Sequence, residues 1–160
     1  MSAEGSFVRL NGEAYYKISD FREMPPFLIN IVSPADVWLF LSSAGGMTAG
    51  RVNEQGSIFP YETDDKLHQQ LETGPKTLIC ARGAFWEPFE RSILSRWNVT
   101  RNLYKACRGT SVIFEEINND LNLTCAWQFT TSGRFGLVKQ TTLLNTGTEP
   151  ISVQILDGLE

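Results

Sequence analysis

The sequence has very little histidine or cysteine: one histidine, His68, and three cysteines, Cys80, Cys107 and Cys125. The cysteines are odd in number and widely spaced, and no Cys-x-x-Cys pair occurs. Neither a disulfide framework nor a structural zinc site is therefore predicted. Each cysteine lies in a run that alternates like a strand, so we expect all three to pack as small buried hydrophobic side chains. No metal and no other cofactor is predicted.

Long apolar runs and runs of one charge are also missing. Stretches such as residues 37–41 are far too short to cross a bilayer, and residues 1–6 lack the basic start and apolar core of a secretory signal. The 14 Lys plus Arg and 18 Asp plus Glu give a net charge of −4, spread along the chain. Binding to nucleic acid needs a concentrated basic face. We therefore expect a cytoplasmic protein that binds neither nucleic acid nor membranes.

Recognisable catalytic patterns are absent as well. No Gly-x-Ser-x-Gly elbow occurs, and a single histidine leaves little freedom for a catalytic triad. Asp64 and Asp65 are adjacent, so their carboxylates diverge, and we interpret them as charges at the start of a helix rather than a catalytic pair. His68 has polar neighbours and is interpreted as a surface residue. No catalytic residue is predicted.

Strand patterns, by contrast, recur along the whole chain, as runs rich in Val, Ile, Thr and aromatic residues between Gly, Asn, Asp and Pro clusters. The clearest run covers residues 121–131, where every second residue is apolar and shares one face. Those residues are Leu121, Leu123, Cys125, Trp127 and Phe129. The run belongs to a predicted antiparallel meander of four strands over 110–117, 121–131, 135–144 and 151–156.

The remaining elements are shorter or less regular. Residues 97–107 alternate untidily, which predicts a bulge or an edge position. Shorter strands are predicted over 14–18, 28–32, 37–42, 48–52 and 77–81, with Gly45-Gly46 as a turn because a P-loop's Lys-Ser/Thr is missing. One short helix is predicted over 63–71, with Thr63 as its N-cap. The predicted fold is mainly β, an antiparallel β-sandwich forming a single domain over residues 1–160, with at most one or two short helices.

Polar and aromatic residues are densest between residues 42 and 68, which makes this the first place to look for a binding site. Tryptophan is abundant, and exposed indoles stack well on the C–H-rich faces of sugar rings. Trp38 and Trp127 lie in apolar runs and are expected in the core, whereas Trp86 has charged neighbours and is expected to be exposed. The candidate carbohydrate-binding residues are Arg51, Tyr61, Asp64 and Trp86.

Several motifs follow one another in a familiar order. They are Gly12-Glu-Ala-Tyr-Tyr-Lys-Ile, Asp36-Val-Trp-Leu-Phe-Leu-Ser-Ser-Ala-Gly-Gly, Gly50-Arg-Val-Asn, Pro60-Tyr-Glu-Thr-Asp and Leu143-Leu-Asn-Thr-Gly-Thr-Glu-Pro-Ile-Ser-Val. Their order resembles the N-terminal β-sandwich of glycoside hydrolase family 94, the cellobiose phosphorylase type, over most of the chain. The resemblance implies a supersandwich similar to galactose mutarotase. It also implies that the catalytic Asp lies in a separate helical (α/α)6 barrel outside these residues.

The resemblance suggests a non-catalytic N-terminal piece of a larger glycoside phosphorylase or glycosyltransferase-like enzyme. Such an accessory domain would support carbohydrate binding, packing against a downstream helical catalytic domain, or formation of a homodimer. The alternative is a free-standing sugar-binding module or a mutarotase-like epimerase, although an epimerase needs a carboxylate base and a histidine acid on either side of the anomeric centre. A β domain used only for oligomer contacts is a third reading.

Overall fold

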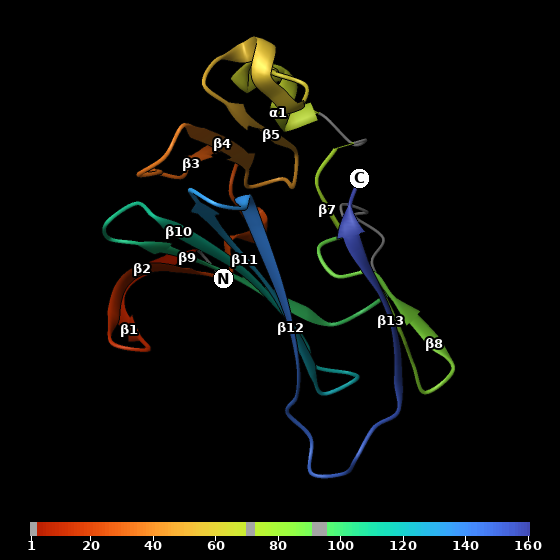
Figure 1. Cartoon of the computed structure of the whole chain (residues 1–160). Coiled ribbons are helices and arrows are strands. Elements are labelled where there is room, and N and C mark those ends of the chain that lie inside the picture. The colour runs from red at the N-terminus through yellow and green to blue at the C-terminus, as the bar shows by residue number, and fades with distance from the viewer. Residues whose placement is uncertain (1–2, 70–72, 91–95) are drawn as a thin grey trace.

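The computed structural model describes residues 3–69, 73–90 and 96–160, and it is mainly β (Figure 1). The strands are β1 (Glu4–Leu10), β2 (Glu13–Ser19), β3 (Leu28–Asn30), β4 (Val37–Ser42), β5 (Met47–Arg51), β6 (Ser57–Phe59), β7 (Pro75–Ala81), β8 (Ala84–Trp86), β9 (Val99–Ala106), β10 (Ser111–Asn118), β11 (Leu123–Ser132), β12 (Gly136–Asn145) and β13 (Val153–Leu159). The helical elements are the 3-10 turns η1 (Phe21–Glu23) and η2 (Glu54–Gly56) and the helix α1 (Asp64–Gln69).

The strands form three antiparallel sheets. Sheet A has six strands in the order β1-β2-β9-β10-β11-β12, sheet B has the order β3-β4-β5-β6, and sheet C has the order β13-β7-β8. Buried apolar side chains from all three sheets belong to one continuous core. Sheet A is therefore one layer, and sheets B and C lie against it, as Figure 1 shows for β4 and β5 above β11 and for β7 and β13 beside β12. The predicted antiparallel β-sandwich is confirmed.

The alternation predicted for residues 121–131 sets the face of sheet A that meets the core. Leu123, Cys125, Trp127 and Phe129 of β11 are all buried, and Leu121 just before the strand is buried with them. On the neighbouring strand, Phe114 lies opposite Trp127 in the same layer. Because successive side chains of a strand point to opposite faces, this periodicity fixes which side of sheet A is covered.

The predicted bulge or edge position of residues 97–107 is wrong. β9 lies inside sheet A between β2 and β10, and its pairing with both strands runs without a register shift. Leu103 belongs to the main core, while Tyr104 and Ala106 form a second buried cluster with Tyr15 on the opposite face of the sheet. The alternation is untidy because both faces of β9 are covered.

The predicted four-strand meander is correct for three strands and wrong for the fourth. β10, β11 and β12 are consecutive neighbours in sheet A, but β13 pairs with β7 in sheet C, with Ile155 opposite Ile79. Residues 146–152 carry the chain from one layer to the other (Figure 1). A period-two pattern predicts a strand but does not name its partner.

In the first half of the chain, β2, β3, β4, β5 and β7 match the predicted strands, and β4 and β5 pair across the predicted turn. Three strands, β1, β6 and β8, were not predicted. The predicted helix corresponds to α1, which buries Leu67 and packs against β4, while Leu71 lies outside the described residues. No helix in the described segments is long and apolar enough to cross a membrane.

All three cysteines are free thiols with different exposures. Cys125 is buried, as predicted, and Cys80 is half-buried. Cys107 is exposed, so the prediction of a buried thiol is wrong there. The reason is that β9 ends at Ala106, which leaves Cys107 in the following turn, where its backbone N–H donates to the carbonyl of Ala14.

Candidate functional site

The four candidate carbohydrate-binding residues do not come together. Trp86 is in the core with 0% of its surface exposed, so the prediction that it is exposed is wrong. Its indole N–H donates to Oε1 of Glu116 at 2.8 Å. The charged residues after Trp86 belong to the segment that follows β8, and their polarity says nothing about where the indole itself points.

Arg51 lies at the exposed end of β5, where its Nη2 is 3.5 Å from the carbonyl oxygen of Gly133 in the turn between β11 and β12. Tyr61 is 52% exposed and meets the ring of Trp38 edge-on, with the centroids 5.7 Å apart. Trp38, expected in the core, is half-buried, and its indole N–H donates to the carbonyl of Asn53. Of the four candidates, Tyr61 offers an accessible aromatic face.

Asp64, the last of the four, takes part in a hydrogen-bonded chain with the only histidine. His68 Nε2 lies 3.0 Å from Asp64 Oδ1, and His68 Nδ1 lies 2.8 Å from Oγ of Ser42. A carboxylate only accepts, so a neutral His68 donates from Nε2 and its Nδ1 accepts from the Ser42 hydroxyl. The histidine is therefore tied between α1 and β4 instead of being the solvated surface residue that the sequence predicts.

The series Asp64–His68–Ser42 contains the residue types of a catalytic triad, but its geometry differs from that of a triad. Ser42 is completely buried, and its Oγ accepts the backbone N–H of Ala44 at 3.0 Å. A nucleophile must reach its substrate, and here the hydroxyl is enclosed in the turn between β4 and β5. The arrangement fixes α1 on sheet B.

A buried ionic network lies between sheet A and sheet C. Glu116 on β10 is 1% exposed, and its carboxylate accepts from Trp86 Nε1, from the backbone N–H of Phe89 and from Arg101 Nε at 2.6 Å. Arg101 on β9 also donates from Nη2 to the carbonyl of Glu90 at 2.7 Å. Burying a charge is tolerated when it is paired and hydrogen-bonded, as Glu116 is.

Phe89 is held by this network in an unusual backbone conformation. Its φ is +64°, in the left-handed region that bulky residues rarely adopt, and such a residue costs of order 1–3 kcal/mol. The hydrogen bond from its N–H to Glu116 keeps the backbone there. Its ring lies against Trp127 with the centroids 4.2 Å apart and the planes inclined by 39°.

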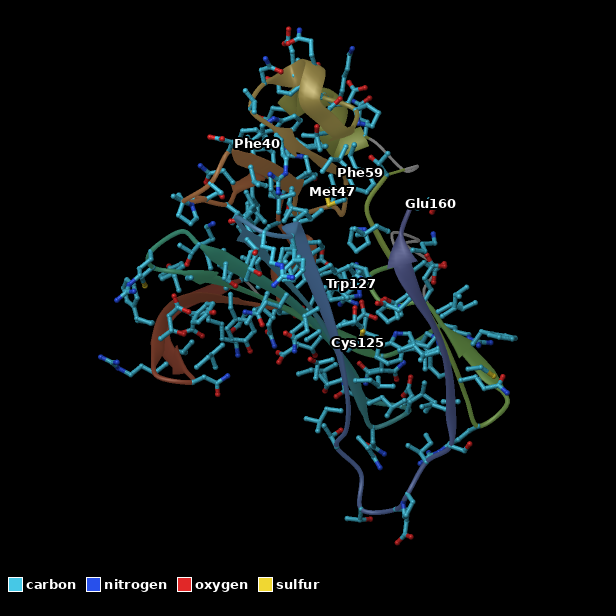
Figure 2. The ribbon with its side chains drawn as sticks, viewed as in Figure 1. Phe40, Met47, Phe59, Cys125, Trp127 and Glu160 are labelled. Carbon is cyan, nitrogen blue, oxygen red and sulfur yellow. The ribbon has the colours of Figure 1, made fainter. Side chains whose placement is uncertain are left out.

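Phe89 and Trp127 line two adjoining pockets, which also share Ala44, Gly45 and Pro75 and which we call the two chambers of one cleft. The first, with a volume of about 240 Å³, is bounded by η1, by the turn after β4, by Pro75 of β7 and by Arg101 of sheet A. The second, of about 190 Å³, is more polar and contains Lys76, Glu87 and Glu90. Trp127 and Glu160, both labelled in Figure 2, lie on its wall.

A second polar network begins at the indole N–H of Trp127. The indole N–H donates to Oγ1 of Thr77 at 2.7 Å, and that hydroxyl donates to Asp157 Oδ1. Lys139 Nζ reaches the same oxygen at 2.6 Å from β12. Burial alone would raise the pKa of Asp157, but the hydrogen bonds from Lys139 and Thr77 outweigh it, so the pKa lies below its ordinary value. The network joins sheet C to sheet A.

Sequence reasoning missed this cleft because its walls come from segments far apart in the chain. Glu116 carried one usable signal, since it is a charged residue that follows Val112 and Phe114 on the core-facing side of β10. Within the segments that the structure describes, no group of three or more His, Cys, Asp or Glu side chains is placed to hold a metal ion. No protein-family model matches the chain, and no curated protein matches it either.

Proposed function

We propose that this chain is a non-catalytic accessory domain of a carbohydrate-active enzyme of the glycoside phosphorylase or glycosyltransferase type. In this role it supports carbohydrate binding, packing against a catalytic domain, or dimerisation. The resemblance to the N-terminal sandwich of glycoside hydrolase family 94 supports the proposal, and the supersandwich assignment depends on that resemblance. The antiparallel sandwich is compatible with it.

The observation that carries the proposal is an apolar patch on the outer face of sheet C. Leu78, Phe85 and Leu156 come from three neighbouring strands and are 37%, 60% and 73% exposed. Leu78 is directly opposite Leu156 in the pairing of β7 with β13. Apolar side chains that gather on one exposed face are typical of surfaces that pack against another protein or domain.

The hydrogen bonding of two carboxylates, those of Glu116 and Asp157, agrees with a non-catalytic role. Glu116 is bound by three donors, and Asp157 is bound by Lys139 and Thr77. Catalysis at a glycosidic bond uses two carboxyl groups on either side of that bond. These two carboxylates instead serve as fixed acceptors inside the sandwich.

An activity assay tests the proposal. The 160-residue chain is incubated with a panel of aryl glucosides and disaccharides, with and without inorganic phosphate, and neither hydrolysis nor phosphorolysis is expected. Turnover that disappears when one carboxylate of the chain is replaced by its amide would overturn the proposal. A heat-denatured sample of the same preparation controls for spontaneous hydrolysis.

A free-standing sugar-binding module is the second candidate, and the aromatic cleft beside Phe89 favours it. Its epimerase version fits the geometry less well, because His68 is in direct contact with Asp64 instead of facing a carboxylate across a sugar ring. Polarimetry of fresh α-glucose separates the two versions. Relaxation that concentrated protein leaves unchanged removes the epimerase, whereas acceleration that is lost in His68→Ala supports it.

A further inference from the structure

We propose that the cleft at the junction of the three sheets binds a neutral carbohydrate of one or two sugar units, with a sugar ring against Phe89 and Trp127. The inference rests on the proposed function, since it gives the carbohydrate-binding role a location. It moves that role away from Tyr61 and Asp64, which lie by Trp38 and His68, and from Arg51 beside the β11–β12 turn, and into the space between the layers. Ligand sites of proteins are commonly concave, largely apolar and provided with a few fixed polar groups.

The aromatic walls supply the apolar part of the site. Phe89, which is half-buried, and Trp127, which is 4% exposed, line both chambers, and the buried rings of Phe21 and Phe114 also line the first. The rings of Phe89 and Phe114 meet at 84°, and those of Phe89 and Trp127 are tilted, so the group forms a bent wall. The C–H-rich face of a pyranose ring is complementary to such a surface, because aromatic faces carry partial negative charge and C–H groups partial positive charge.

The charges around the first chamber favour a neutral ligand. Two cations line the chamber. The charge of Arg101 is balanced by the buried carboxylate of Glu116, and Arg22 Nε lies 3.8 Å from the exposed carboxylate of Glu23. A guanidinium has five N–H donors, and Arg101 donates from Nε to Glu116 and from Nη2 to the carbonyl of Glu90. The ion-paired guanidinium of Arg101 can donate hydrogen bonds to a sugar hydroxyl oxygen. Because its charge is already compensated by Glu116, it would attract an anion only weakly.

The second chamber provides charges of both signs. Lys76 Nζ is 2.7 Å from Glu87 Oε1, and Glu90 lies on the same wall. A sugar hydroxyl both donates and accepts, so it can bond to carboxylates and to an ammonium group in one site. A disaccharide that has one ring in each chamber would therefore find apolar contact in the first and paired hydroxyl contacts in the second.

The strained backbone of Phe89 prepares the site before a ligand arrives. Its left-handed conformation is fixed by the hydrogen bond to Glu116, and Glu116 is fixed in turn by Trp86 and Arg101. The ring of Phe89 is thus held in place by the core rather than by a ligand. Strained residues of this kind cluster at ligand sites, and a pre-positioned wall lowers the ordering cost of binding.

The test is a titration of the ¹⁵N-labelled chain with glucose, cellobiose and maltose, followed through the Trp127 indole N–H and the Phe89 amide. At least one of the three sugars is expected to shift both signals with saturation. In Phe89→Gly the one ring that is half-buried in both chambers is lost, but the left-handed backbone and the N–H to Glu116 are retained, because glycine adopts positive φ without strain. This variant is expected to stay folded and to bind with Kd raised about tenfold or more.

Two further variants make the outcome decisive. Phe135→Ala removes a ring that is 70% exposed and outside the cleft, and it should bind like the wild type. Tyr61→Ala tests the aromatic face of sheet B: loss of binding there, with Phe89→Gly unaffected, would overturn the cleft and leave the accessory role in place. Absence of saturable shifts with all three sugars would also overturn the inference. Saturable binding in the cleft together with carboxylate-dependent turnover would instead overturn the proposed function.

Discussion

At the residue scale, Glu116 couples the core to the cleft through three hydrogen bonds on one buried carboxylate. In Glu116→Gln the mostly buried guanidinium of Arg101 loses its counter-charge, and one of the acceptor oxygens is replaced by an NH₂ donor that faces other donors. Breaking a buried ion pair on one side costs about 3–5 kcal/mol, so we expect a loss of unfolding free energy of that order. Urea denaturation measures it, with the exposed Glu149→Gln as the control. A loss below about 1 kcal/mol would contradict this account.

Gly50 is a second residue on which packing depends. A Cβ added there would lie 2.4 Å from the Trp38 ring and 2.7 Å from the carbonyl oxygen of Gly56. We expect Gly50→Ala to lower the unfolding free energy by about 1–3 kcal/mol, because the ring and the turn must both move. Gly158→Ala is the matched control, since a Cβ at Gly158 meets no atom within 4 Å. Equal unfolding midpoints for the two variants would show that the contact yields easily.

Trp86 shows where prediction from the sequence fails at this scale. The local pattern places charged residues beside it, and neighbouring polarity is the usual sign of an exposed side chain. The acceptor that makes its burial favourable is Glu116, thirty positions further along the chain. Leu123 and Phe129 were predicted correctly because their burial follows from the period of their own strand.

At the scale of elements, the clamp between Asp157 of β13 and Lys139 of β12 links sheet C to sheet A. Because the folded pKa of Asp157 is lower than its ordinary value, the charged carboxylate stabilises the fold above about pH 4, and this contribution is lost as the pH falls through the folded pKa. Asp157→Asn should therefore be less stable than the wild type at pH 7, with a smaller difference at pH 3. Urea unfolding at both pH values measures the difference, and a gap that widens in acid would contradict the clamp.

The elements themselves were predictable from the sequence to different extents. Strands with a clear period of two, such as β11, were placed well, as was the turn between β4 and β5. The partner of β13 was not, because its register with β7 depends on a crossover between layers that no local pattern records. The cleft depends on the same crossover and on the turn after β4. It could not be predicted from the sequence, because its walls come from segments of all three sheets.

At the scale of the whole molecule, two of the three thiols, Cys107 and Cys125, report on the integrity of the sandwich. Burial, with smaller contributions from Asp157 and Glu116, raises the pKa of Cys125 to about 12, whereas Cys107 is exposed. Since the thiolate is the reactive form, a disulfide reagent at pH 8 should label Cys107 in the folded protein and Cys125 only as the chain unfolds. Mass spectrometry of quenched samples identifies the sites. Rapid labelling of Cys125 in the native protein would mean that the layers separate readily.

The pairing of β7 with β13 also has a consequence for the order in which the molecule is made. Ala81 pairs with Val153, and Pro75 pairs with Leu159. The ribosome therefore has to synthesise most of the strands of sheet A before β7 can pair with β13. At typical translation speeds this delay is roughly 4–16 s. During that time the apolar strand Pro75–Ala81 has only the three residues of β8 to pair with. The nascent chain therefore exposes a strand edge for seconds, which makes it a natural client for a chaperone that holds extended segments.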